Sequence, residues 1–404
     1  MPEHRSPVVL DRAVQAGPAH FPVHIRHGGG DLDGSLAELT EVVRGLGHPR
    51  TVLLTHPALP TRHVALVLRH LGAAAPADVL WPARPEGHVG RPARSSGPSR
   101  RSDLSRPGRD GARRAGAGPV VPDGSLVVAL GGTRTLAAAG RVRRADGTRP
   151  PVLRLPTTLR AMTDSALSVA GDGNGCAAPV LVRVQLEFLE TLPARDVCAG
   201  LSAPAAVVLA VVPASREQVA ARLRRDGRYD PAVLASFVVL SVQARAALLC
   251  YDPQEDGPGA AFGYGRAVAR ALRAEPDADL RHGAAEALGI RVAARVSRLA
   301  GLLDAEGERA HADLLDRAGL PRSLPPRVSV ESVLDALVGD GAGAGLVLLD
   351  RLGQPHVHRG RLVTPVDAGL LRAGLATIAP QPAAPPAPAA TAPATRAPQP
   401  VAVP

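Results

Sequence analysis

Two neighbouring stretches of this sequence decide its fold: Pro156-Thr157-Thr158-Leu159 and Asp164-Ser165-Ala166-Leu167-Ser168. They follow an apolar segment, residues 152–155, which is typical of a short strand that a proline ends. Hydroxyl and carboxylate groups that gather directly after a strand are typical of the edge at which an open α/β sheet binds a nucleotide or a sugar phosphate. The sequence therefore predicts a ligand site at the carboxyl end of this strand.

The elements around this strand alternate between strands and helices from residue 21 to about residue 170. We expect strands at 20–25, 51–55, 78–81, 126–130 and 152–155, and helices at 36–46 and 62–71. This alternation predicts a parallel, Rossmann-like sheet. From about residue 193 onward the long periodic segments are helical, at 203–211, 215–225, 231–249, 260–274, 282–303, 305–318 and 330–337, with a short β-hairpin expected near 346–361.

The predicted fold is thus an α/β N-terminal Rossmann-like domain followed by an all-α C-terminal domain. We expect a flexible N-terminus at 1–20, a nucleotide-binding domain at 21–185 with a basic loop at 91–118, and a helical domain at 186–379. Residues 380–404 are rich in proline and alanine, a composition that predicts a disordered or polyproline-like tail.

Composition favours a soluble, cytoplasmic protein. Apolar residues make up 45% of the chain but aromatic residues only 2%, so leucine, valine and alanine must build the core. We find no apolar run near twenty residues and no signal-peptide pattern, and we expect no membrane partner. The three cysteines, Cys176, Cys198 and Cys250, lack metal-binding spacing, which indicates buried or incidental thiols.

All 47 basic residues are arginine, and the net charge is +10. The absence of lysine excludes a Schiff base and a lysine acid or base, because a guanidinium group stays charged. The basic excess lies in residues 91–114, without aromatic residues for base stacking, so we expect no nucleic-acid partner. A solvated loop is the simplest interpretation, and weak contact with an acidic partner is the alternative.

Several blocks of the sequence together resemble the sugar-phosphate cyclases, the family of dehydroquinate synthase and 2-deoxy-scyllo-inosose synthase. The resemblance extends over about residues 21–379. Besides the two stretches above, it rests on the strand 126–130 with Gly131-Gly132, on 189–195, on 252–272 and on the pair His282-Gly283. Ser165-Ala166-Leu167-Ser168 is more similar to the inosose synthases than to the dehydroquinate synthases.

This resemblance implies a dehydroquinate synthase-like fold whose helical domain binds metal and substrate. It also implies a lyase of carbon–oxygen bonds that uses NAD and Zn or Co to cyclise a sugar phosphate such as glucose 6-phosphate. Family members of this kind serve antibiotic biosynthesis and are normally homodimers.

The metal-ligand positions that the resemblance implies are largely replaced in this chain. They correspond to Ala203, Arg266 and His282, so only one ligand is retained, and one imidazole cannot hold a catalytic metal. Arg270 stands at a substrate-contact position and Arg245 at a lysine position. Arg266 and Arg270 are four residues apart, and either bind an anion such as a sugar phosphate or lie on a solvated helix face.

The cofactor positions that the resemblance implies are partly kept. The retained residues are Gly131, Gly132, Thr157, Thr158, Asp164 and Asn174. The aspartate that holds the ribose corresponds to His56, and the later glycine and the acid of the glycine-rich turn are replaced. We therefore expect weak nucleotide binding and no tightly retained cofactor.

Three hypotheses about function remain open. The first is a non-catalytic partner of an active cyclase, as a homodimer or a heterodimer. The second is an active lyase, with NAD and a divalent metal or with His282, Asp164 and the arginines alone. The third is a sensor that binds a sugar phosphate in the cleft between the domains.

Overall fold

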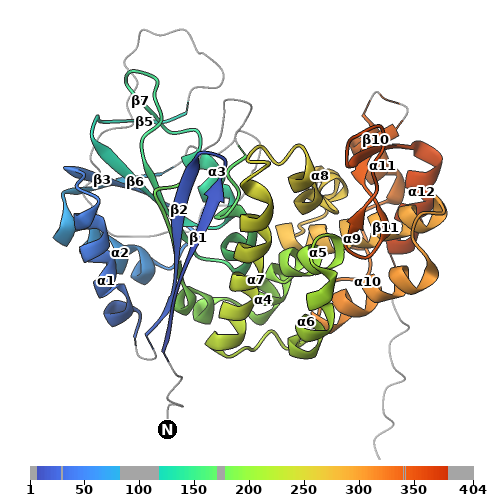
Figure 1. Cartoon of the computed structure of the whole chain (residues 1–404), viewed down its shortest axis with the longest axis horizontal. Helices are drawn as coiled ribbons and strands as arrows, with labels where there is room; N and C mark the ends of the chain where they lie inside the picture. The colour runs from blue at the N-terminus through green and yellow to red at the C-terminus, as the bar shows by residue number, and fades with distance from the viewer. Residues whose placement is uncertain are drawn as a thin grey trace, which may run out of the picture.

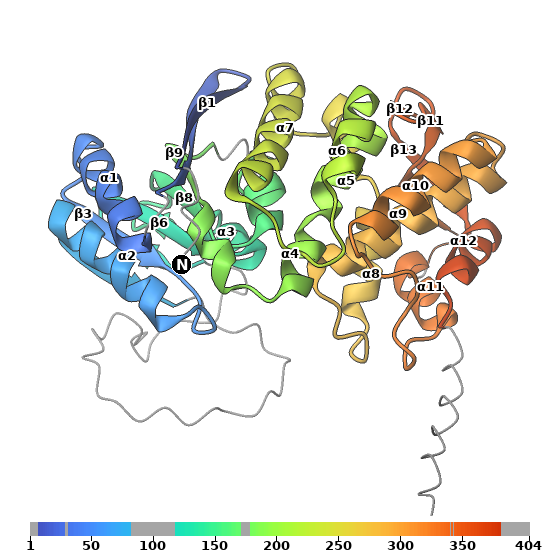
Figure 2. The same ribbon diagram turned by 90° about the horizontal axis from the view of Figure 1, so that it is seen from below.

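The computed structural model of the 404-residue chain describes residues 7–28, 31–81, 118–170, 178–339, 341 and 343–380 (Figure 1). A sheet with its helices forms one part, and helices from the second half of the chain form the other, side by side with it (Figure 2). The basic loop and the proline-rich tail predicted from the sequence fall almost entirely on residues 82–117 and 381–404, outside the described residues.

The first part is a seven-stranded sheet in the order β1-β2-β9-β8-β6-β3-β4. All its neighbouring strands pair in parallel except β1 and β2. The strands are β1 (Val8–Ala16), β2 (Ala19–His27), β3 (Arg50–Leu54), β4 (Ala77–Leu80), β6 (Ser125–Gly131), β8 (Val152–Pro156) and β9 (Leu181–Gln185). Every residue of β6 is buried, as a central strand covered on both faces requires. The predicted Rossmann-like sheet is confirmed.

Helices α1 (Leu32–Gly45), α2 (Thr61–Ala74) and α3 (Thr133–Ala139) accompany the sheet, with a small pair of strands, β5 (Val120–Val121) and β7 (Arg143–Arg144), at its margin. Helix α1 shows why such segments are helical. The side chain of Asp31 caps it by accepting from the backbone N–H of Gly34, and Leu36, Leu39 and Val43 recur on its buried side. Burial of this apolar stripe fixes the helix on the sheet.

The N-terminus differs from the expected flexible segment 1–20. Residues 8–16 form β1, which pairs with β2 along its whole length, from Val8 opposite His27 to Ala16 opposite Ala19. Val14 and Ala16 are fully buried, and Gly17, with φ of +55°, closes the tight turn. The prediction was wrong for residues 8–20 because Asp11, Arg12 and Gln15 interrupt their apolar residues, and the pairing with β2 makes the segment a strand.

The second part is mainly helical, as predicted. Its helices are α4 (Ala194–Gly200), α5 (Ser202–Ala210), α6 (Arg216–Arg222), α7 (Pro231–Leu249), α8 (Arg266–Ala274), α9 (His282–Leu299), α10 (Ala305–Arg317), α11 (Val330–Val338) and α12 (Ala368–Leu375). The predicted single helix 260–274 is broken at Gly265, which has φ of +79°. A Cβ there would lie 2.7 Å from the backbone nitrogen of Ile290, so this glycine lets α8 approach α9 closely.

The hairpin expected near 346–361 has a different pairing. Strand β10 (Gly343–Val347) pairs with β13 (Val363–Asp367), and β11 (Leu349–Arg351) pairs with β12 (Gln354–Pro355) between them. The strand β13 was not expected, because Pro365 interrupts its apolar pattern. The C-terminal part is therefore helical with two small sheets, and not strictly all-α.

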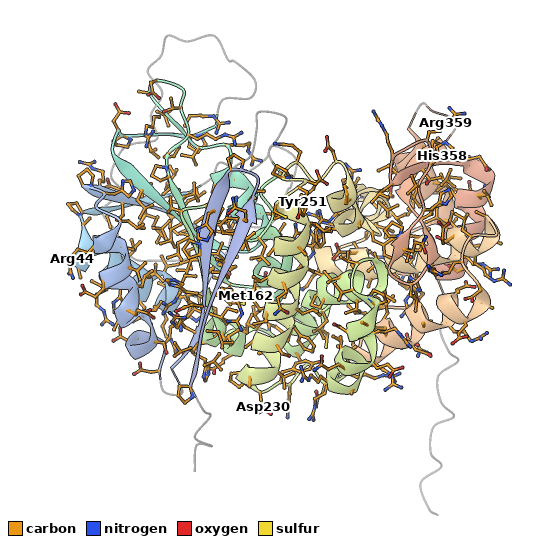
Figure 3. The ribbon with its side chains drawn as sticks, viewed as in Figure 1. Arg44, Met162, Asp230, Tyr251, His358 and Arg359 are labelled. Carbon is orange, nitrogen blue, oxygen red and sulfur yellow. The ribbon has the colours of Figure 1, made fainter. Side chains whose placement is uncertain are left out.

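Helix α7 is, within the described residues, the one helix long and apolar enough to cross a membrane. It runs between Asp230 and Tyr251, at its two ends (Figure 3). Half of its residues are buried, it packs against β1 and α5, and its Arg245 is only 1% exposed. We therefore interpret α7 as an interior helix of a globular protein, and the cytoplasmic location stays a prediction.

Candidate functional site

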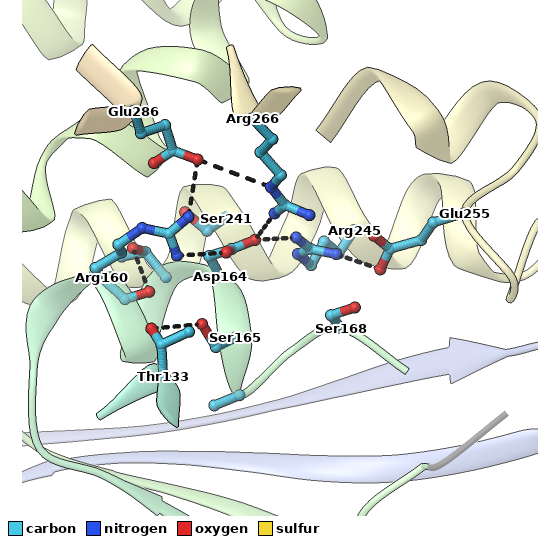
Figure 4. Close-up of polar contacts among 12 residues, drawn as sticks. Thr133, Arg160, Asp164, Ser165, Ser168, Ser241, Arg245, Glu255, Arg266 and Glu286 are labelled. Carbon is cyan, nitrogen blue, oxygen red and sulfur yellow. Dashed lines mark hydrogen bonds and ion pairs between the residues drawn. The ribbon is translucent and has the colours of Figure 1, made fainter. Parts of the chain in front are cut away.

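The site is built around Asp164, which follows β8 in a π-helical turn (Ala161–Ser165). Such turns are frequent at functional sites. The carboxylate of Asp164, 6% exposed, accepts hydrogen bonds from the guanidinium groups of Arg160, Arg245 and Arg266 (Figure 4). Arg160 Nη1 lies 2.7 Å from Oδ2, whereas Arg245 and Arg266 both contact Oδ1. The sheet, α7 and α8 therefore meet at one buried carboxylate.

Glu286 on α9 supplies a second carboxylate to the same cluster. It is 1% exposed, and it accepts from Arg160 Nη2 at 2.8 Å and from the hydroxyl of Ser202 at 2.7 Å. The Nε of Arg266 lies 3.8 Å from Glu286 Oε1. Arg160 and Arg266 thus each bridge the two buried carboxylates, one of which comes from the sheet part and the other from the helical part.

Glu255 supplies the third carboxylate, 2.5 Å from Arg245 Nη1. It has φ of +55°, in a loop that the side chain of Asp252 holds together. That side chain accepts from the backbone N–H groups of Gly257 at 3.0 Å and Gly259 at 2.7 Å. The loop therefore fixes Glu255 in an uncommon backbone conformation, aimed at the cluster.

Three guanidinium groups and three carboxylates balance their own charge in this cluster. Burial acts to raise the pKa of Asp164, but Arg266, Arg160 and Arg245 together outweigh burial and hold this pKa below its usual range. Burial acts to lower the pKa of Arg266, but Asp164 and Glu286 raise it overall. Asp164 and Arg266 therefore stay ionised near neutral pH, and neither can exchange protons with a substrate.

Two cavities flank the cluster. The smaller, of about 560 Å³, lies among α3, the π-helical turn and α8, and the larger, of about 1040 Å³, lies beside the turn between β6 and α3. Four residues line both cavities: Thr133, Arg160, Arg273 and His282. A ligand could therefore extend from one cavity into the other past these side chains.

The positions that the resemblance assigns to a metal do not fit one. Ala203 is a buried methyl group on α5, and Arg266 presents a guanidinium group already paired with carboxylates. His282 is the only one with a ligating atom; burial, followed by Arg160 and Arg273, lowers its pKa to about 3. Within the described residues, no three His, Cys, Asp or Glu side chains gather as a metal site requires. One imidazole beside a guanidinium group does not fit zinc or cobalt.

The pair His282-Gly283 also has a packing role that is independent of a metal. A Cβ on Gly283 would lie 1.8 Å from the backbone oxygen of Ala199, so only glycine lets α9 begin this close to α4. This close contact between α9 and α4 explains why residue 283 is a glycine, although Ala203 and Arg266 have replaced two of the metal ligands that the resemblance implies.

The nucleotide positions are better preserved. Gly132, Thr157 and Thr158 line the larger cavity, and a Cβ on Gly131 would lie 2.4 Å from the hydroxyl oxygen of Thr135. The cavity has the room and the hydroxyl groups to hold NAD, which accepts a hydride when bound. Of the other predicted residues, Asp164 is fully engaged by arginines, and Asn174 lies outside the described residues.

The structure thus brings Arg245, Arg266 and Asp164 into direct contact, and it places Arg270 and His282 in the wall of the smaller cavity. Sequence reasoning missed four members of the site: Arg160, Ser202, Glu255 and Glu286. Two signals were available. Glu286 is a lone acid in an apolar helix one turn after His282, and Arg160 directly follows the Pro-Thr-Thr-Leu stretch.

The sequence comparisons agree with this fold. The family described as 3-dehydroquinate synthase C-terminal matches residues 212–341. The 2-deoxy-scyllo-inosose synthase of Streptomyces kanamyceticus is 33% identical over 280 residues, which are 64% of this chain and 72% of that enzyme. This chain belongs to the sugar-phosphate cyclase family. A second relative is the 2-deoxy-scyllo-inosose synthase of Micromonospora echinospora. It is 32% identical over 265 residues, which are 61% of this chain and 67% of that enzyme.

Solved structures confirm the dehydroquinate synthase-like fold. A crystal structure of 2-deoxy-scyllo-inosose synthase, complexed with carbaglucose-6-phosphate, NAD+ and Co2+, superposes with a TM-score of 0.71 at 21% identity. It covers 91% of this chain and 99% of that chain. ValA, a 2-epi-5-epi-valiolone synthase from Streptomyces hygroscopicus with NAD+ and Zn2+ bound, gives a TM-score of 0.61 at 15% identity, with 91% and 99% covered. The whole described chain therefore follows the architecture of the cyclases.

Proposed function

We propose that this chain is a non-catalytic member of the sugar-phosphate cyclase family, a partner of an active cyclase in aminoglycoside-type antibiotic biosynthesis. The contact of Arg266 with Asp164 and Glu286 carries this proposal. It puts a guanidinium group, paired on both sides, at a position where the resemblance places a metal ligand. A cation supplied by the chain itself satisfies the carboxylates there, so no metal ion is needed to balance them.

The chemistry implied by the resemblance depends on groups that act as a set. A metal ion stabilises negative charge that develops on a substrate oxygen, and the protein must hold that ion with several ligands. Arg266 cannot coordinate a substrate oxygen as a Lewis acid, and with Ala203 the second ligand is also missing. Loss of one member of a coupled catalytic set removes most activity, so loss of two supports a protein without cyclase turnover.

Binding is the function that such a protein retains. A fold does not by itself imply its usual chemistry, and sites can be lost while the core persists. Because the resemblance implies that the family normally forms homodimers, we expect this chain to pair with an active cyclase through the surface that active subunits use for each other.

An active lyase is the second candidate function. It is favoured by the 33% identity to the Streptomyces kanamyceticus enzyme and by a cavity with room for a nucleotide. This candidate would use NAD with a divalent metal, or would rely on His282, Asp164 and the arginines without one.

Turnover of glucose 6-phosphate separates the two candidates. Purified protein is incubated with glucose 6-phosphate, NAD and Co²⁺, with the Streptomyces kanamyceticus enzyme as the active control, and inosose formation is measured. We expect none from this chain, and turnover above the protein-free background would establish the active lyase. Sedimentation of the two proteins together then tests the partner role: a mixed species supports it, and sedimentation as separate species refutes it.

A further inference from the structure

Helix α8 presents a stripe of arginines to one cavity. Arg266, Arg270 and Arg273 lie at positions i, i + 4 and i + 7, which places them on one face of the helix. All three line the smaller cavity, whereas Val268 and Leu272 on the other side are buried in the core. Arg270 is exposed and Arg266 and Arg273 are partly buried, so solvent reaches the stripe, but all three arginines face a concave site between the two parts of the molecule.

The smaller cavity as a whole is strongly basic. Its lining contains two carboxylates, Asp164 and Glu255. It contains six arginines: Arg149, Arg154, Arg160, Arg266, Arg270 and Arg273. Both carboxylates are already engaged by arginines of the buried cluster. Of the four arginines outside the cluster, Arg149 and Arg154 have partners of their own, so Arg270 and Arg273 supply the positive charge that attracts anions into the cavity.

Arg270 and Arg273 carry this excess charge. Across the described ranges, neither has a carboxylate within ion-pair distance, in contrast to Arg266. Burial, followed by the charges of Arg134 on α3 and of Arg160, lowers the pKa of Arg273. Arg134 lines the larger cavity, and Arg273 lines both. Guanidinium groups gathered in this way repel one another, and a bound anion relieves that repulsion.

Hydroxyl groups complete the wall shared by the two cavities. Ser165 Oγ donates to Thr133 Oγ1 at 2.9 Å, so the hydroxyl hydrogen of Thr133 remains to be donated to an acceptor in either cavity. Ser168 lines the smaller cavity as well. Guanidinium forks with hydroxyl donors between them match the oxygen atoms of phosphate groups.

The geometry points to a metal-independent site for an anion with two phosphate groups, held by Arg270 and Arg273 in the smaller cavity and by Arg273 and Arg134 toward the larger one. Arg273 stands where the two cavities meet, so one phosphate group occupies each side of it. A sugar bisphosphate and a nucleoside diphosphate share this chemistry. The inference deepens the proposed function and rests on it, because it gives the protein a ligand that requires no metal.

Calorimetric titration of the full chain in EDTA tests this site, with inorganic pyrophosphate as the first probe and inorganic phosphate as the comparison. We expect pyrophosphate to bind at least about tenfold more tightly, because two phosphate groups engage more guanidinium forks than one. Arg273→Gln should weaken pyrophosphate binding by about tenfold or more, and Arg134→Gln by less. Arg298→Gln is the matched control, because Arg298 is exposed at the end of α9 and lines neither cavity.

Two further titrations distinguish the sources of this chemistry. Fructose 1,6-bisphosphate represents the sugar bisphosphates, and ADP represents the nucleoside diphosphates; the tighter binder names the class, and either supports the site. Circular dichroism of each variant confirms folding, and Arg273→Lys, which keeps the charge without the fork, should recover part of the affinity.

The results separate this inference from the proposed function. Absence of pyrophosphate binding at millimolar concentration, or equal affinity in Arg273→Gln and the wild type, overturns the inference and leaves the non-catalytic proposal standing. Cobalt-dependent turnover of glucose 6-phosphate in a parallel sample overturns the proposed function, and with it a site defined as independent of metal.

Discussion

Replacement of Asp164 by asparagine removes the charge that three guanidinium groups share. Removing one partner of a buried ion pair costs about 3–5 kcal/mol, because the other charge is left buried without compensation. Arg160 and Arg245 each keep a second carboxylate, whereas Arg266 keeps only Glu286, at 3.8 Å. One guanidinium group of the three therefore loses most of its compensation. We expect the free energy of unfolding to fall by about 3 kcal/mol, the lower end of that range.

Urea unfolding followed by circular dichroism measures this loss. Asp316→Asn is the matched control, because Asp316 also pairs with two arginines, Arg291 and Arg322, but nearer the surface. Asp316 is 19% exposed and its partner Arg322 is 61% exposed, so solvent screens this group more than the buried cluster and the loss should be smaller. A loss in Asp164→Asn no larger than the loss in Asp316→Asn would refute the cluster as a stabilising unit.

The pH dependence of the same difference is a second readout. The pKa of Asp164 is lowered in the folded protein, so its contribution to stability is present above the unfolded pKa of about 4 and is lost as the pH falls through the folded pKa. The difference between wild type and Asp164→Asn should therefore be constant from about pH 5 to about pH 8, and it should shrink only in stronger acid.

Three further predictions concern packing, protonation and metal. Gly265→Ala should lose about 1–3 kcal/mol in urea unfolding, because φ is +79° and the new Cβ would meet Ile290; Gly263→Ala, with open space around it, is the control. His311 has its pKa lowered to about 4 by burial, so stability should fall as the pH drops from about 6.5 to 4; a slope in His311→Gln as steep as in the wild type would contradict this. Dialysis against EDTA should leave the melting temperature unchanged, and a lower one would reveal a bound metal.

Much of the fold could be predicted because its signals are local. The apolar strands before Gly131 and Pro156 and the long periodic helices α7 and α9 were found at nearly their observed positions. Elements that depend on distant partners were missed. The strand β1 forms because β2 offers it a sheet edge, and the break at Gly265 exists because α9 lies against it.

The site was predictable only in part, for the same reason. Arg245, Arg266 and Asp164 could be singled out one by one, but their meeting at one carboxylate depends on packing of three separate segments. Glu286 escaped notice because a single acid in an apolar helix gives no spacing signal, and Arg160 because nothing in the local sequence shows that it reaches both Asp164 and Glu286. The sequence shows that an arginine replaces a metal ligand at position 266. Only the structure shows that its guanidinium group pairs with Asp164 and Glu286.

Equilibrium dialysis with Co²⁺ tests most directly whether the guanidinium group of Arg266 replaces a metal ion in balancing the charge of Asp164 and Glu286. We expect no binding to the wild-type protein at micromolar cobalt, because Arg266 occupies the carboxylates and, of the three ligand positions, only His282 offers an imidazole within the described residues. The double variant Ala203→Glu with Arg266→His serves as the comparison, since it restores the two missing donors. Stoichiometric binding of cobalt to the wild type at micromolar concentration would show that Arg266 has not replaced the metal.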